Sequence, residues 1–141
     1  MEQQTLEVKK ENKETKAIAL KSGGLDGAIA TKLIIDQGIK VEALNFHSPF
    51  CTCSSNSKYN QCGATYFAQK LEIPIKHISK GDEYLEIVRN PKFGYGKNIN
   101  PCIDCRIHIL EKTKEYMKEI GAEFIITGEV LGQRPKSQML H

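Results

Sequence analysis

The chain has 141 residues, which suits a single domain, and its 40% hydrophobic and 26% charged residues are typical of a globular protein. No apolar run approaches the roughly 20 residues that a membrane span needs, and the charged N-terminus lacks the apolar centre of a secretory signal. We therefore expect a cytoplasmic protein with no membrane partner, whose net charge of +3 permits a polyanionic partner without demanding one.

The predicted elements follow from apolar periodicity and from glycines that end helices. Residues 1–15 are polar and of mixed charge, which predicts a flexible N-terminal arm before one domain at residues 16–141. In chain order, the domain is predicted to contain a strand at 16–21, a helix at 25–37, a strand at 41–46, a helix at 64–71, a strand at 74–78, helices at 84–89 and 103–120, and a strand at 123–127. The apolar face of the first helix is predicted to consist of Leu25, Ile29, Leu33 and Ile34.

Strands that alternate with helices predict an α/β fold, in which a parallel sheet has helices on both faces. In such sheets, ligands bind outside the carboxyl ends of the strands. Three segments of unusual composition follow strands, at residues 22–27, 48–63 and 127–135, so we expect them at one edge of the sheet. No further helix and strand follow to complete the sheet, and we expect a domain that is truncated at its C-terminus.

Residues 22–27, here called the phosphate loop, read SGGLDG and connect the first strand to the first helix. Glycines let backbone N–H groups approach phosphate closely, and the positive end of the helix attracts the anion. Ser22 adds a hydroxyl donor, while Asp26 must act through Mg²⁺ or hold the loop, because a bare carboxylate repels phosphate. Lys21 is a candidate cation, although a structural role fits its strand position equally well. A plain strand-to-helix turn is the alternative for the loop as a whole.

The phosphate loop resembles the SGGxDS loop of the N-type ATP pyrophosphatases, or PP-loop proteins. The resemblance implies a Rossmann-like fold of the adenine nucleotide alpha hydrolase type that binds ATP and Mg²⁺. It implies a reaction in which a carbonyl oxygen attacks the α-phosphorus of ATP, pyrophosphate leaves, and a nucleophile then displaces AMP. The nucleotide-binding residues implied within the loop, where Gly27 replaces the usual Ser, are Ser22, Gly23, Gly24, Asp26 and Gly27.

Cys102 and Cys105, here called the cysteine pair, lie in the segment NPCIDCR at the predicted start of the last helix. Their spacing puts both thiols on one helix face, about 5–6 Å apart at Cβ, so both can reach one metal ion or cluster. A helix N-terminus favours thiolates, and Arg106 is a candidate to offset their charge. Two buried structural cysteines are the alternative.

The cysteine pair resembles that of the tRNA thiouridine synthases. Its NPCxxC segment is similar to the NP-[CD]-x-x-C segment of the 2-thiouridine synthases, and to the CxxC of thiolases that hold a [4Fe–4S] cluster by three cysteines. In those relatives the third cysteine comes late in the chain, whereas none follows Cys105 here. The third ligand is then either absent from this chain or one of Cys51, Cys53 and Cys62.

These three cysteines lie in a polar loop, and their spacing matches no standard zinc pattern. They are interpreted as cluster or zinc ligands, as persulfide carriers or as incidental thiols. After the last strand, Thr127 and Gly128 resemble the TG that closes the nucleotide pocket of the superfamily.

The resulting hypothesis is an ATP-dependent tRNA sulfurtransferase of the thiouridine synthase type. It would adenylate a uridine carbonyl and insert sulfur through an iron–sulfur cluster or a cysteine persulfide, with Asp26, Cys102 and Cys105 as catalytic residues. Its partners would be tRNA and a sulfur donor protein or sulfide, and a homodimer is left open. The alternatives are a PP-loop ligase or amidotransferase with a nitrogen nucleophile and structural zinc, and a non-catalytic nucleotide-binding domain.

Overall fold

The computed structural model describes residues 14–50 and 62–133, so most of the predicted N-terminal arm lies outside it. The strands are β1 (Lys16–Leu20), β2 (Lys40–His47), β3 (Ile75–Ser79) and β4 (Phe124–Ile126). The helices are α1 (Leu25–Ile35), α2 (Gly63–Lys70), α3 (Gly81–Arg89), the short 3₁₀ turn η1 (Lys97–Ile99) and α4 (Cys102–Ile120).

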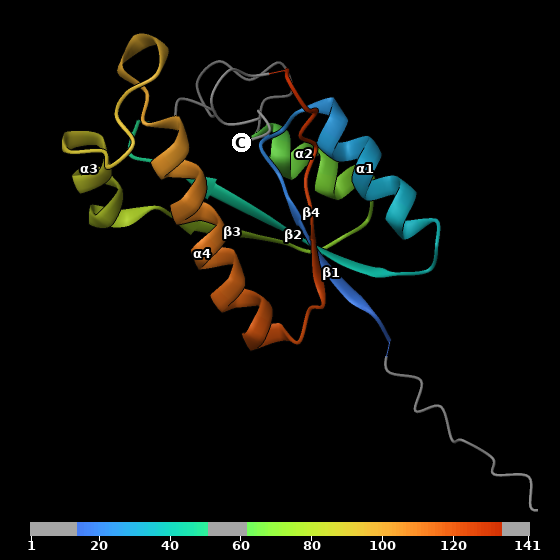
Figure 1. Ribbon diagram of the computed structural model, residues 1–141. Coiled ribbons are helices and arrows are strands. Elements are labelled where there is room, and N and C mark those ends of the chain that lie inside the picture. Colours follow the sequence, from blue (N-terminus) through green and yellow to red (C-terminus); the bar gives the residue numbers. More distant parts are fainter. Residues whose placement is uncertain (1–13, 51–61, 134–141) are drawn as a thin grey trace, which may run out of the picture.

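The predicted α/β architecture is confirmed. All described strands run parallel in the order β3-β2-β1-β4, with β1 and β2 at the centre. One face of the sheet packs against α1 and the other against α4, with α2 on the α1 side (Figure 1). Because parallel strands are covered on both faces, β1 is apolar throughout its centre, where Ala17, Ile18 and Ala19 are buried.

The predicted apolar face of α1 was largely wrong. Leu25, Ile29 and Leu33 are 63%, 51% and 59% exposed, whereas Ala28 and Thr31 are buried. The helix is apolar on more than one side, so periodicity alone favoured the face with the larger side chains. The structure instead turns its small residues toward the sheet, which allows close packing, and completes the contact with partly buried residues that include Ile34.

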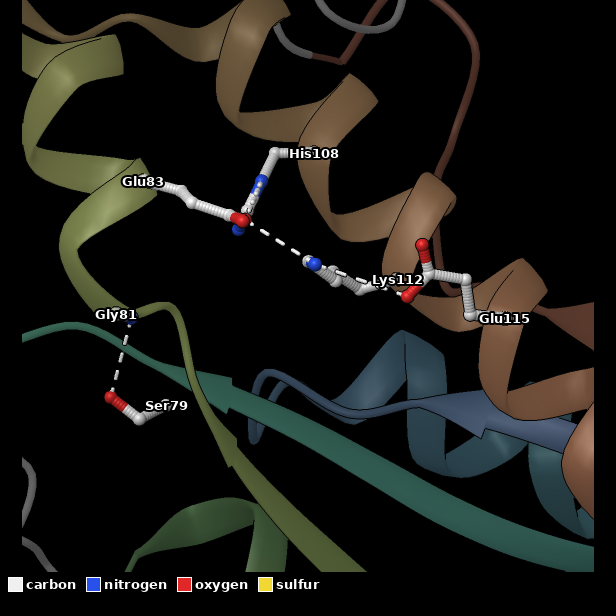
Figure 2. A network of polar contacts seen from close by, with 6 residues as sticks. All are labelled: Ser79, Gly81, Glu83, His108, Lys112 and Glu115. Atoms are coloured by element: carbon white, nitrogen blue, oxygen red, sulfur yellow. Dashed lines mark hydrogen bonds and ion pairs between the residues drawn. The ribbon is translucent and has the colours of Figure 1, made fainter.

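Helix α3 begins at Gly81, three residues before the predicted start at residue 84. Its first turn contains Asp82 and Glu83, whose charges hid the helix from an apolar pattern but favour a helix N-terminus. Glu83 holds α3 against α4, because its carboxylate lies 3.3 Å from Lys112 Nζ and 3.9 Å from His108 Nδ1 (Figure 2). The position of α4, whose first turn contains the cysteine pair, is set mainly by the packing of Tyr116, Met117 and Ile120 against the sheet.

No helix in the described part of the chain has both the length and the apolar character that crossing a membrane requires.

The neighbouring residues Leu33 and Ile34 allow a matched test of which face of α1 packs against the sheet. We expect Ile34→Ala to lower the free energy of unfolding by about 2 kcal/mol, since Ile34 packs on the core beside Ala17 and Ala19. Leu33→Ala should change it by less than about 0.5 kcal/mol, because Leu33 is exposed. Urea unfolding measures both, and a larger loss for Leu33→Ala would contradict the described packing.

Candidate active site

A cleft of about 870 Å³ opens at the carboxyl ends of β1, β2, β3 and β4. This is the edge at which the sequence predicted a binding site. The cleft is lined by residues of the phosphate loop, of the first turn of α4, of the loop that precedes α4 and of the segment after β4. Predicted site residues in its lining are Ser22, Gly24, Asp26, Gly27, Cys102, Cys105, Thr127 and Gly128. The nucleotide-binding and sulfur motifs therefore face one space.

The phosphate loop is fixed by close backbone packing on two sides. Gly23 has φ +92°, and a Cβ there would lie 3.1 Å from the Gly63 Cα at the start of α2. Gly128 packs against the other end of the loop, where a Cβ on Gly128 would lie only 2.3 Å from the Gly27 backbone nitrogen. Gly23 and Gly128 thus have steric reasons to be glycine, while Gly27 has room for a Cβ, with its nearest neighbours at 3.9 Å.

Lys21 lies directly before the phosphate loop and is 4% exposed. Its Nζ donates to the Gly27 carbonyl oxygen at 2.7 Å, so its side chain spans the loop from the end of β1 to the first turn of α1. Burial lowers the pKa of Lys21 from 10.5 to about 8. Asn45 holds the Lys21 backbone, since its buried amide donates to the Lys21 carbonyl oxygen at 2.6 Å. The loop entrance is therefore rigidly positioned.

The two cysteines of the pair differ in environment. Cys102 is exposed, whereas Cys105 is half-buried and accepts a hydrogen bond from Lys80 Nζ at 3.2 Å. Lys80 follows β3 and also lies over the Tyr84 ring, 4.4 Å from its centroid. Burial raises the pKa of the Tyr84 hydroxyl, and the neighbouring Cys105 sulfur raises it further. The pair is a feature of the cleft rather than of the core.

Sequence reasoning missed Lys80 and selected Arg106 as the cation beside the cysteine pair. In the structure, Arg106 forms an ion pair with Glu129, which follows Gly128. The ion pair joins α4, directly after the cysteine pair, to the segment after β4, and so links two sides of the cleft. The position of Lys80 at the carboxyl end of β3 was the available signal, since ligands bind at such ends.

The loop of residues 90–101 forms the remaining wall of the cleft. Asp104, between the two cysteines, accepts hydrogen bonds from the backbone nitrogens of Lys92 at 3.1 Å and Phe93 at 3.0 Å. Asn98 and Ile99 have φ values of +57° and +58°, a left-handed conformation that costs energy for side chains other than glycine. Such strain is concentrated at functional sites and is maintained by the surrounding contacts.

The described residues do not complete a cluster site. A cluster held by three cysteines needs a third thiol, and no group of three or more His, Cys, Asp or Glu side chains within residues 14–50 and 62–133 can hold a metal ion. Cys62 precedes α2 and is not among the residues that line the cleft. Cys51 and Cys53 lie outside the described residues.

Comparison with known protein families decides the affiliation of the chain. Residues 12–141 match the family described as "Thiamine biosynthesis protein (ThiI)". The chain belongs to the ThiI family. Its recognition as a PP-loop protein of the thiouridine synthase group is thereby confirmed.

Relatives of the ThiI-family chain include a probable tRNA sulfurtransferase of Thermococcus kodakarensis, with 27% identity over 84% of this chain and 30% of the relative. A tRNA-specific 2-thiouridylase MnmA of Flavobacterium johnsoniae is 30% identical over 76% of this chain and 29% of the relative. The chain therefore spans about a third or less of these relatives.

Two solved structures share the fold. A 4-thiouridine synthetase in an RNA complex with bound ATP matches 89% of this chain and 32% of its own, with a TM-score of 0.65 and 23% identity. The NMN synthetase of Francisella tularensis matches 79% of this chain and 44% of its own, with a TM-score of 0.56 and 21% identity. At these identities the likeness establishes the Rossmann-like fold.

The close packing of Gly128 and the free space beside Gly27 predict different changes in the free energy of unfolding when each glycine is replaced by alanine. Gly128→Ala should lower the free energy of unfolding by about 2 kcal/mol or more, because the new Cβ overlaps the Gly27 backbone. Gly27→Ala should be neutral or stabilising by up to about 1 kcal/mol, because it adds a helix-favouring residue where there is room. Urea unfolding of both variants is the measurement, and an unaffected Gly128→Ala variant would contradict the geometry.

The lowered pKa of Lys21 predicts how stability depends on pH. Below about pH 8 the buried ammonium stays charged, and a pKa lowered from 10.5 to about 8 corresponds to roughly 3 kcal/mol of destabilisation. Between about pH 8 and 10.5 the unfolded state binds more protons than the folded state, so this destabilisation decreases. Lys21→Met should therefore be more stable than wild type at pH 7, with an advantage that shrinks toward pH 10. Chemical unfolding across this range checks the difference, and an advantage that grows with pH would contradict it.

Proposed function

We propose that this chain performs the chemistry of an ATP-dependent tRNA sulfurtransferase, with residues 16–141 as its PP-loop domain. The observation that carries the proposal is the single cleft between the phosphate loop and the cysteine pair. Adenylation of the carbonyl oxygen and attack of sulfur on the carbonyl carbon act on the same carbonyl group, so the protein groups for both steps need to face one space. Membership of the ThiI family supports the proposal, as do relatives named as tRNA sulfurtransferases.

In the first step, a uridine carbonyl oxygen attacks the α-phosphorus of ATP, and the bond to pyrophosphate breaks. The phosphate loop binds the leaving phosphates through its backbone N–H groups and the N-terminus of α1. Asp26 lines the cleft without an ion pair to the described residues and fits Mg²⁺, which is commonly bound by one or two carboxylates together with substrate phosphates. When bound, Mg²⁺ would neutralise charge on the phosphates.

In the second step, the exposed Cys102 carries sulfur as a persulfide, which forms when the Cys102 thiolate attacks the outer sulfur of a persulfide on a donor protein and the donor thiolate leaves. The terminal sulfur attacks the adenylated carbon, and the bond to AMP breaks. Cys105 then attacks the Cys102 sulfur, which releases the thiolated base and leaves a Cys102–Cys105 disulfide. A thiol reductant returns the pair to two thiols. Lys80 and Tyr84 hold Cys105 in place for the second attack.

The persulfide route is supported because it needs two thiols, and the cysteine pair supplies both in the lining of the cleft. The nitrogen-nucleophile alternative with structural zinc is disfavoured because the cysteine pair lines the cleft, where a structural metal would occupy substrate space. A tRNA uridine as the target, a donor protein or sulfide as the sulfur source and a possible homodimer stay predictions.

Single substitutions separate the two steps. Asp26→Asn should lower ATP- and tRNA-dependent pyrophosphate release by roughly a hundredfold, because the ligand for Mg²⁺ is lost.

Cys102→Ser should retain pyrophosphate release but form no thiolated tRNA. Cys105→Ser should accumulate tRNA linked to Cys102 by a disulfide that reductant releases. The assays are pyrophosphate release and mass spectrometry of tRNA nucleosides with a persulfide donor.

Cys62→Ser is the matched control, since Cys62 is a free thiol that is not in the cleft lining. It should retain both activities. Loss of thiolation in Cys62→Ser, together with iron in the wild-type protein purified without oxygen, would replace the persulfide route with a cluster held by Cys62. Full thiolation by Cys102→Ser would refute the role of the cysteine pair.

A further inference from the structure

Lys21 has a burial and charge state that a purely structural role does not explain. Among residues 14–50 and 62–133, it is the one lysine or arginine that is buried. Within the same residues, its side chain makes one hydrogen bond, to the Gly27 carbonyl oxygen, and forms no ion pair with a carboxylate. A buried ammonium without a counter-ion is costly, and a neutral donor would bridge the loop at a lower cost.

No carboxylate of the described residues forms an ion pair with Lys21, and the surroundings of Lys21 form a place for an anion. Lys21 lines the cleft together with Ser22, Gly24, Asp26 and Gly27 of the phosphate loop, where the proposed function assigns the Asp26 carboxylate to Mg²⁺. The N-terminus of α1 lies in the same loop and attracts anions. Residues that carry an ammonium and a hydroxyl therefore line one cleft together with the N-terminus of α1.

We propose that Lys21 Nζ is a direct ligand of the phosphate group held by the phosphate loop. In the ligand-free protein it donates to the Gly27 oxygen, and its remaining N–H donors are available to a bound phosphate. The anion then supplies the counter-charge that the buried ammonium lacks. This inference rests on the proposed function, which provides ATP and pyrophosphate as the phosphate-bearing ligands. It adds a cationic side chain to a loop otherwise made of backbone donors and a hydroxyl.

The test is binding of inorganic pyrophosphate, with Mg²⁺ present, by isothermal titration calorimetry. Lys21→Gln keeps a donor for the Gly27 oxygen but removes the charge, and should bind pyrophosphate roughly tenfold or more weakly than wild type. Lys16→Gln is the matched control, because Lys16 is at the opposite end of β1 and pairs with Glu42. It removes the same charge and should bind pyrophosphate as wild type does.

Thermal unfolding shows whether Lys21 binds phosphate or only stabilises the phosphate loop. Without ligand, Lys21→Gln should melt no lower than wild type, while the rise in melting temperature caused by pyrophosphate should be largely lost. Lys21→Met is the second variant, and we expect the same two results for its melting temperature without ligand and for its response to pyrophosphate.

Four results would overturn the inference. They are unchanged pyrophosphate binding by Lys21→Gln, an equal loss in Lys16→Gln, failure of both Lys21 variants to fold, and a wild-type protein that binds neither pyrophosphate nor ATP. The first three leave the proposed function standing, whereas the last removes it as well.

Discussion

Close backbone packing around the phosphate loop is the constraint on which the site depends. Gly23 lies against the start of α2, and Gly128 lies against Gly27, at distances that leave no room for a Cβ on Gly128. The loop is therefore held between an element that follows β2 and the segment that follows β4. Because parallel strands bring these segments to one edge of the sheet, the loop, the segment after β4 and the first turn of α4 surround one cleft.

The fold was predictable because its signals are local and repeated. Apolar strands that alternate with helices determine a parallel sheet, and glycines at the end of β1 mark the phosphate loop. The buried face of α1 was not predictable in the same way. A helix with apolar residues on several sides can bury more than one face. Whether Ala28 and Thr31 or Leu25 and Leu33 are buried depends on how closely the helix packs on the sheet.

The candidate site was predictable motif by motif but not as an arrangement. The phosphate loop and cysteine pair were found as short patterns, while their common cleft results from how α4 packs on the sheet through Tyr116, Met117 and Ile120. Lys80 belongs to no motif, and its contact with Cys105 and the pairing of Arg106 with Glu129 become visible only when distant segments meet. The cluster hypothesis could not be judged from spacing, because a third thiol has to be brought near the pair in space.

The central claim is that nucleotide and cysteine chemistry share one cleft. Its most direct test is the rate at which iodoacetamide alkylates Cys102 and Cys105, followed by mass spectrometry with and without Mg²⁺-ATP. A nucleotide bound between the phosphate loop and α4 should shield the pair and slow alkylation of both thiols, roughly tenfold for the exposed Cys102. Alkylation rates that do not change at saturating ATP would contradict the claim, because the nucleotide and the cysteine pair would then occupy separate places.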